Sequence, residues 1–147
     1  MNEKWPRWLR ASLAEHFNTN INGNYLHIEG QQHKEEEPDD RFELRVDGPD
    51  SKELPGKQYL LLVYVNLLVR VKQDIDIYKI DTYKGRGLKA FTTNINVFKY
   101  GDDDVLLGCL ERYAQVIVTD YYQVAQPNNI LHATVESQYQ ITLSEGE

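Results

Sequence analysis

The longest apolar run in the chain is YLLLVYVNLLVRV, residues 59–71, in which only Asn66 and Arg70 are strongly polar. Alternate residues from Tyr59 to Val71 form one wholly apolar face, while the other face turns polar toward its end, a period typical of a strand. A transmembrane helix would need about twenty apolar residues, and Arg70 interrupts this run. At about 3.3 Å per residue the run spans about 40 Å. We therefore expect a long central strand that projects beyond its own sheet, buried on both sides in its first half and on one side in its second.

The length and composition indicate one domain, residues 1–147, with a core that needs no disulfide bonds. Cys109 is the only cysteine and lies among leucines, so we interpret it as a small buried hydrophobe rather than a nucleophile. The net charge of -7 argues against sequence-independent binding of duplex DNA. The charged and aromatic start, MNEKWPRWLR, does not resemble a signal peptide, and we expect a cytoplasmic product.

Two amphipathic helices are predicted. The cluster NTNING at 18–23 ends the first helix. One face of this helix is formed by residues that recur at steps of three and four: Trp5, Trp8, Leu9, Leu13, His16 and Phe17. We interpret the two tryptophans as anchors on the sheet in preference to a partner-binding role. A second helix, capped by Asp74, shares one face among Ile77, Ile80, Lys84, Leu88 and Phe91.

The remaining pattern is that of strands. Short strands are predicted at 24–29 and 42–46, with turns at 47–50, 54–56 and 101–104. Further strands are predicted around 95–99 and 116–122, whereas 105–112 fits either a strand or a short helix. The cleanest alternation is at 131–143, where one side faces the core. We expect its apolar face to pack under the first helix through Trp8, Leu13 and Phe17.

An acidic segment, QQHKEEEPDD at 31–40, separates the first two strands. Its carboxylates repel one another and Pro38 breaks any strand ladder, so we interpret it as an exposed loop or flexible hairpin tip. Calcium binding is disfavoured because the spaced ligands and the tight glycine turn are missing.

Sequence signatures of catalysis are lacking. The four histidines have no metal-site spacing, and the GRG at 85–87 is not followed by the Lys-Ser/Thr of a phosphate loop. We therefore expect neither an enzyme nor a bound metal or cofactor. An enzyme site built from carboxylates distant in sequence is the less favoured alternative.

The layout predicts an α+β fold, a mainly antiparallel sheet with an N-terminal amphipathic helix and a second helix packed on it, plus a projecting β-hairpin. This layout resembles the tail terminators of long-tailed bacteriophages. Three runs carry the resemblance: FELRVDGP at 42–49, VFKYGDDDVLLGCL at 97–110 and ILHATVESQYQITL at 130–143.

The resemblance implies a virion protein of the tail or neck, assembled in the host cytoplasm. It implies a homo-hexameric ring that caps the tail tube, stops its polymerisation and joins it to the head-side connector or stopper protein. DNA would pass through the lumen without specific binding, and no membrane would be involved. The alternatives are another tail tube or neck subunit, or a non-viral monomeric binding module.

A ring requires one contact repeated around a closed rotation, and a strand longer than its domain offers an edge for that contact. Our hypothesis for the subunit interface combines the acidic segment with the less buried face of the central strand. Its residues are Glu35, Glu36, Glu37, Asp39, Asp40, Leu68 and Arg70.

Overall fold

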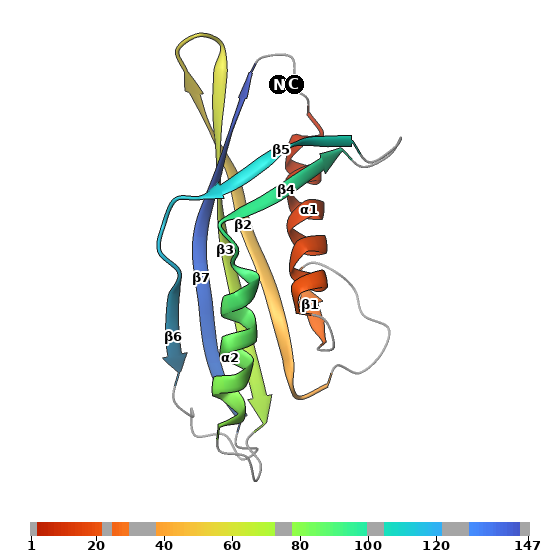
Figure 1. Cartoon of the computed structure of the whole chain (residues 1–147), viewed down its shortest axis with the longest axis vertical. Helices are drawn as coiled ribbons and strands as arrows, with labels where there is room; N and C mark the ends of the chain where they lie inside the picture. The colour runs from red at the N-terminus through yellow and green to blue at the C-terminus, as the bar shows by residue number, and fades with distance from the viewer. Residues whose placement is uncertain are drawn as a thin grey trace.

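The computed structural model describes residues 3–21, 25–29, 38–72, 78–99, 105–121 and 130–144, and in these ranges the chain is α+β. Its elements are α1 (Trp5–Asn20), β1 (Leu26–Ile28), β2 (Arg41–Leu54), β3 (Gln58–Lys72), α2 (Lys79–Ala90), β4 (Asn94–Lys99), β5 (Val105–Arg112), β6 (Ile117–Tyr121) and β7 (Ile130–Ser144) (Figure 1). The open question over 105–112 is thus answered in favour of a strand. Neither helix of the described ranges is long and apolar enough to cross a membrane.

One curled sheet contains all the strands, in the order β1-β2-β3-β7-β5-β4, with β6 also beside β7. The predicted central strand is confirmed: β3 pairs with β7 over its whole length, from Gln58 opposite Ser144 to Lys72 opposite Ile130. The pairings are antiparallel except for β1, which runs parallel to β2. The acidic segment between these two strands is therefore not the tip of a hairpin.

The two sides of β3 differ as the alternation predicts. Every second residue from Leu61 to Val71 is buried on the side that α1 and α2 cover, here called the covered face (Figure 1). The opposite side is the open face; on β3 it comprises Leu60, Leu62, Tyr64, Asn66, Leu68 and Arg70, all half-buried. The expected burial of the first half on both sides is wrong, because both helices lie on the covered face.

The apolar face of α1 is confirmed, since Trp5, Trp8, Leu13 and Phe17 are buried. Its predicted packing on β7 is wrong: α1 packs mainly on β4 and β2, and α2 lies on β3 and β7. The β4–β5 hairpin crosses β7 on the covered face (Figure 1). The crossing is so close that a Cβ at Gly108 would lie 3.0 Å from Cδ1 of Ile141.

Helix α2 also differs from its predicted pattern. Asp74 and Ile77 lie outside the described residues, and the helix begins at Lys79. The helix turns Gly87 toward the sheet, where a Cβ would lie 3.1 Å from Cδ2 of Leu67. Leu88, predicted to be buried, is consequently 45% exposed. The glycine allows a closer approach of helix and sheet than a larger residue would.

A projecting β-hairpin is present, as the predicted fold class includes, but β2 and β3 form it rather than the two short strands that flank the acidic segment. β2 and β3 extend beyond both helices to the turn at 55–57 (Figure 1). The predicted turn at 47–50 is wrong, because these residues belong to β2 and form an irregularity in its register with β3. Gly48 has a φ of +97° there, a conformation that favours glycine.

Candidate functional site

The residues of the predicted interface fall into separate groups. Glu35, Glu36 and Glu37 lie outside the described residues. Asp39, Asp40 and Arg70 lie together at the end of β3 that is remote from the hairpin turn. Leu68 lies on the open face, next to Glu43 of β2. The structure therefore does not place Asp39 and Asp40 beside the projecting hairpin.

Asp39 and Asp40 make contacts within the chain. Arg70 Nη1 donates a 2.8 Å hydrogen bond to the carbonyl oxygen of Asp39 and pairs with its carboxylate at 3.6 Å. Asp40 Oδ1 accepts a 2.7 Å hydrogen bond from the backbone N–H of Lys72, and its other oxygen forms an ion pair with Lys79. These contacts tie the start of β2 to the end of β3 and the start of α2. Their first role is structural.

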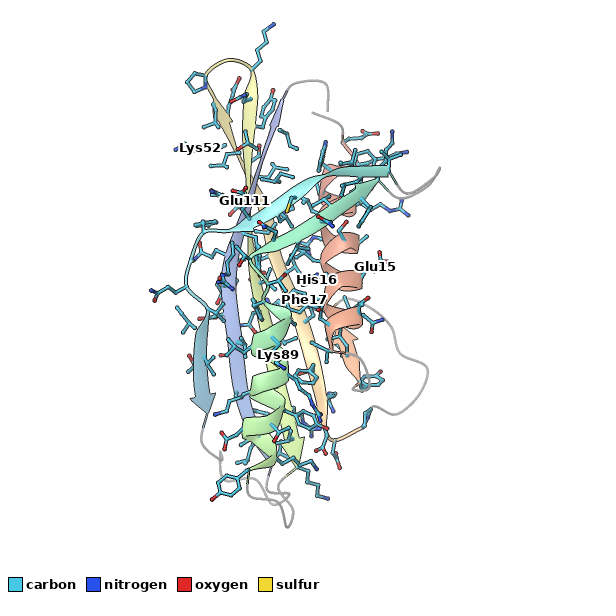
Figure 2. The ribbon with its side chains drawn as sticks, viewed as in Figure 1. Glu15, His16, Phe17, Lys52, Lys89 and Glu111 are labelled. Carbon is cyan, nitrogen blue, oxygen red and sulfur yellow. The ribbon has the colours of Figure 1, made fainter. Side chains whose placement is uncertain are left out.

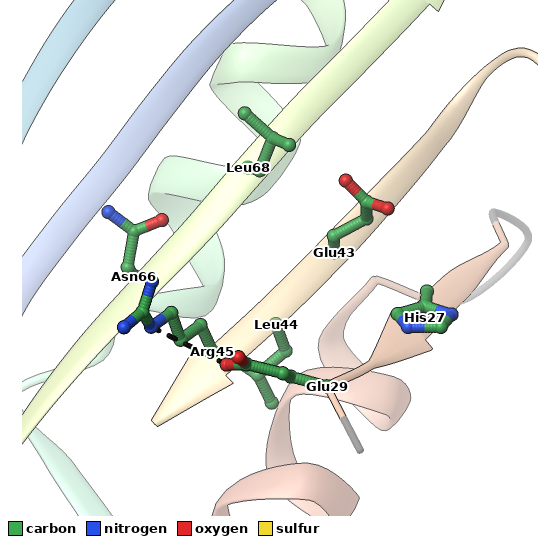
Figure 3. Close-up of a pocket in the computed structure, with 7 residues that line it drawn as sticks. All are labelled: His27, Glu29, Glu43, Leu44, Arg45, Asn66 and Leu68. Carbon is green, nitrogen blue, oxygen red and sulfur yellow. Dashed lines mark ion pairs between the residues drawn. The ribbon is translucent and has the colours of Figure 1, made fainter. Parts of the chain in front are cut away.

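Leu68 lines a shallow pocket on the open face, with a volume of about 300 Å³. We call it the Leu68 pocket; its lining residues are His27, Glu29, Glu43, Leu44, Arg45, Asn66 and Leu68 (Figure 3). Arg45 and Glu29 form an ion pair at 3.5 Å across its rim (Figure 3). Because the two opposite charges lie together, the rim can receive an uncharged side chain without leaving either one unpaired.

Polar side chains link β3 to β7 on the same face. Glu136 accepts hydrogen bonds from the hydroxyl of Tyr64 and, at 3.1 Å, from Nδ2 of Asn66. His132 lies opposite Arg70, and burial together with Arg70 lowers the pKa of its imidazole. The open face thus combines half-buried leucines with an ordered polar network, a composition suited to contact with another protein.

The projecting end is a three-stranded ribbon of β2, β3 and β7 whose two edges are open in the described ranges. On one side, β1 pairs only with residues 42–44 of β2. On the other, β6 and β5 pair only with residues 132–136 and 139–140 of β7. Arg10 of α1 covers part of the first edge, donating to the carbonyl oxygens of Val46, at 2.8 Å, and Gly48. Beyond that point no described strand pairs with either edge of the ribbon.

A further edge that no described strand covers, and which the sequence did not suggest as an interface, is β6. Ile117 is 55% exposed and Val118 is 41% exposed, although both are large apolar residues. Neighbouring residues of a strand point to opposite faces, so two adjacent apolar residues are both buried only if both faces are covered. The adjacent pair Ile117-Val118 was therefore the sequence signal that this strand either has both faces covered or exposes an apolar side chain.

The described residues show no group of three or more His, Cys, Asp or Glu side chains placed to hold a metal ion. Burial raises the pKa of the half-buried Cys109, which favours its protonated thiol over the thiolate. The prominent features are thus sheet edges and an open sheet face rather than a cluster of reactive groups. The sequence matches no known family model, and comparison with curated proteins finds no similar sequence.

Proposed function

We propose that this chain is a structural subunit of a phage tail terminator, which acts by assembly rather than by turnover. The observation that carries the proposal is the ribbon of β2, β3 and β7, which extends past both helices with open edges (Figure 1). An open strand edge presents unpaired N–H and C=O groups and invites pairing with another chain. A subunit that keeps such a ribbon is well suited to contacts with the other subunits of an assembly.

In this proposal the subunits form a homo-hexameric ring in the virion tail or neck. The ring caps the tube of tail tube protein and joins it to the head-side connector or stopper protein. The net charge of -7 supports a passage for DNA, since carboxylates around a lumen repel phosphates and keep the duplex from binding the wall.

The test compares two exposed lysines on different parts of the molecule (Figure 2). Lys52 lies on the ribbon and Lys89 on α2. Lys52→Glu and Lys89→Glu change the net charge equally, but only the first places a new charge on the ribbon. We expect Lys52→Glu to give overlong or unjoined tails in electron micrographs, and Lys89→Glu to give normal ones. A melting curve of each subunit verifies folding.

A stronger variant shortens the ribbon in register. Deleting Lys52 and Glu53 together with their partners Leu60 and Tyr59 removes two pairs and keeps the turn. Because two residues leave each strand, the remaining side chains keep their faces. Normal-length tails that join heads with both this variant and Lys52→Glu would contradict the proposal.

The oligomeric state separates the proposal from a monomeric binding module, which would use a cavity such as the Leu68 pocket for a ligand. Light scattering coupled to size-exclusion chromatography measures the mass directly. We expect a ring mass for the concentrated protein, or ring formation on added tail tubes. A monomer under both conditions would favour the binding module.

A further inference from the structure

The two lateral edges of the sheet, β1 and β6, lie level with each other. Successive register partners run across the five strands from β1 to β6: Ile28, Leu44, Leu67, Val135 and Val118. Each of these residues lies on the covered face. The two edge strands therefore occupy opposite sides of the same stretch of sheet, as a contact repeated around a ring requires.

The strand directions at these edges are complementary. β1 runs parallel to β2, while β2, β3, β7 and β6 are antiparallel in turn. β1 and β6 consequently run in opposite directions within one subunit. If a second copy stands beside the first in the same orientation, its β1 meets β6 as an antiparallel partner, which the ladder of an antiparallel sheet accepts.

The side chains also match on both faces. On the covered face, Val118 would lie next to the half-buried Leu26 and Ile28 of the neighbour. On the open face, Ile117 lies opposite Glu136 and is therefore level with Asn66 and Arg45, which line the Leu68 pocket. Exposed apolar side chains at one edge thus correspond to apolar neighbours and a pocket at the other.

Charge allows this contact. The side chains that the structure describes on β6 are uncharged: Ile117, Val118 and Thr119. On the opposite edge, the charges of Arg45 and Glu29 are already paired with each other at 3.5 Å. Docking therefore brings these uncharged side chains to a rim at which Arg45 and Glu29 already neutralise each other.

We infer that β6 of one subunit pairs with β1 of the next copy of this chain, with Ile117 entering the neighbour's Leu68 pocket. The inference rests on the proposed assembly and names its contact. It assigns Leu68 to the receiving side, whereas the ribbon of β2, β3 and β7 stays available for contacts along the axis of the ring.

A charge-rescue experiment tests the contact. Ile117→Glu places a carboxylate beside Glu29 of the neighbour, and Glu29→Lys places a cation beside Arg45, so each alone should weaken ring association at least about tenfold in light scattering. The double variant brings opposite charges together across the contact, so it should recover rings. Leu88→Glu is the matched control, because Leu88 is an exposed leucine on α2 and should leave assembly unchanged.

The outcomes are distinct. Wild-type rings that persist in both single variants would overturn the β6–β1 contact and leave the proposed function intact. A wild-type protein that stays monomeric alone and on tail tubes would overturn both. As a second readout, hydrogen exchange at the amides of 117–121 should slow in rings relative to a dissociated variant. Unchanged exchange there would also overturn the pairing, even if rings form.

Discussion

The hydroxyl of Tyr139 donates a 2.7 Å hydrogen bond to the carbonyl oxygen of Thr92. Tyr139 is fully buried on β7, and Thr92 lies in the short connection between α2 and β4. Arg112 of β5 donates from Nη1 to the carbonyl oxygen of Phe91, the residue before Thr92. The connection between α2 and β4 is therefore fixed to two strands that are distant in sequence.

We expect Tyr139→Phe to lower the free energy of unfolding by about 1 to 2 kcal/mol, because the carbonyl oxygen of Thr92 loses its buried donor. The ring itself is kept, so the cavity cost is small. Urea denaturation at neutral pH measures the change. Phe98→Leu, at a half-buried ring on β4, controls for a general sensitivity of this region to aromatic changes. A Tyr139→Phe protein as stable as the wild type would contradict the stabilising role of this hydrogen bond.

The same pair predicts a dependence on alkaline pH. Burial raises the pKa of Tyr139 to about 12, although the nearby Arg112 opposes the shift. An unfolded tyrosine ionises near pH 10. Above that pH the unfolded state loses a proton that the folded state retains, so stability is lost as the pH rises from 10 to 12. The stability difference between wild type and Tyr139→Phe should therefore shrink in this range. A constant difference would show that Tyr139 does not titrate as proposed.

Arg10 predicts a second coupling, between α1 and the irregular part of β2. Its guanidinium donates to the carbonyl oxygens of Val46 and Gly48. Arg10→Ala removes both hydrogen bonds, and since the contact is exposed to solvent we expect a loss of only about 1 kcal/mol. Arg7→Ala, at an exposed position of the same helix, should cost less. Thermal melts compare the two, and equal losses would contradict a specific role of Arg10.

Two glycines should respond to alanine in opposite directions. At Gly48 a Cβ would lie 2.8 Å from the carbonyl oxygen of Leu62, and φ is +97°, so Gly48→Ala should cost more than about 1 kcal/mol. At Gly85 a Cβ would meet open space inside α2, and Gly85→Ala should stabilise by about 0.5 to 1 kcal/mol. Urea denaturation measures both. A stable Gly48→Ala variant would mean that the backbone of β2 adapts more easily than its geometry indicates.

The features that periodicity encodes were predictable from the sequence. The alternation of β3 and β7 and the apolar stripe of α1 each depend on neighbours along the chain, and all three are confirmed. The parallel pairing of β1 with β2 was not predicted, because an acidic segment between two short strands suggests a hairpin. The docking of α1 on β4 also depends on where the β4–β5 hairpin crosses β7, a relation that no local pattern contains.

The candidate site was predictable to a smaller extent. Exposure of Leu68 on the less buried face follows from the alternation of β3, but its pocket requires β1 beside β2. Arg70 and Asp39 were expected at an interface, yet their contacts lie within the chain because β2 begins where β3 ends. β6 was expected as a strand. Its adjacent apolar residues Ile117 and Val118 were a signal of exposure, but its position at an edge follows only from the strand order.

Asp40 provides the test that separates stability from assembly. Its carboxylate accepts a 2.7 Å hydrogen bond from the backbone N–H of Lys72 and pairs with Lys79 at the start of α2. Both side chains of the ion pair are mostly shielded from solvent, so its loss should be measurable. We expect Asp40→Ala to lower the free energy of unfolding by on the order of 1 kcal/mol, because a strand N–H loses its acceptor and the helix loses its tie to β2.

The control for Asp40→Ala is Asp50→Ala, which removes the same charge from an exposed position of the ribbon. Since Asp40 acts within the subunit, the folded Asp40→Ala protein should assemble as the wild type does once temperature is kept well below its melting point. Asp50→Ala should leave the melting curve unchanged. Urea denaturation and light scattering on both variants distinguish the roles. If Asp40→Ala weakened assembly without loss of stability, the original assignment of this carboxylate to the subunit interface would be correct.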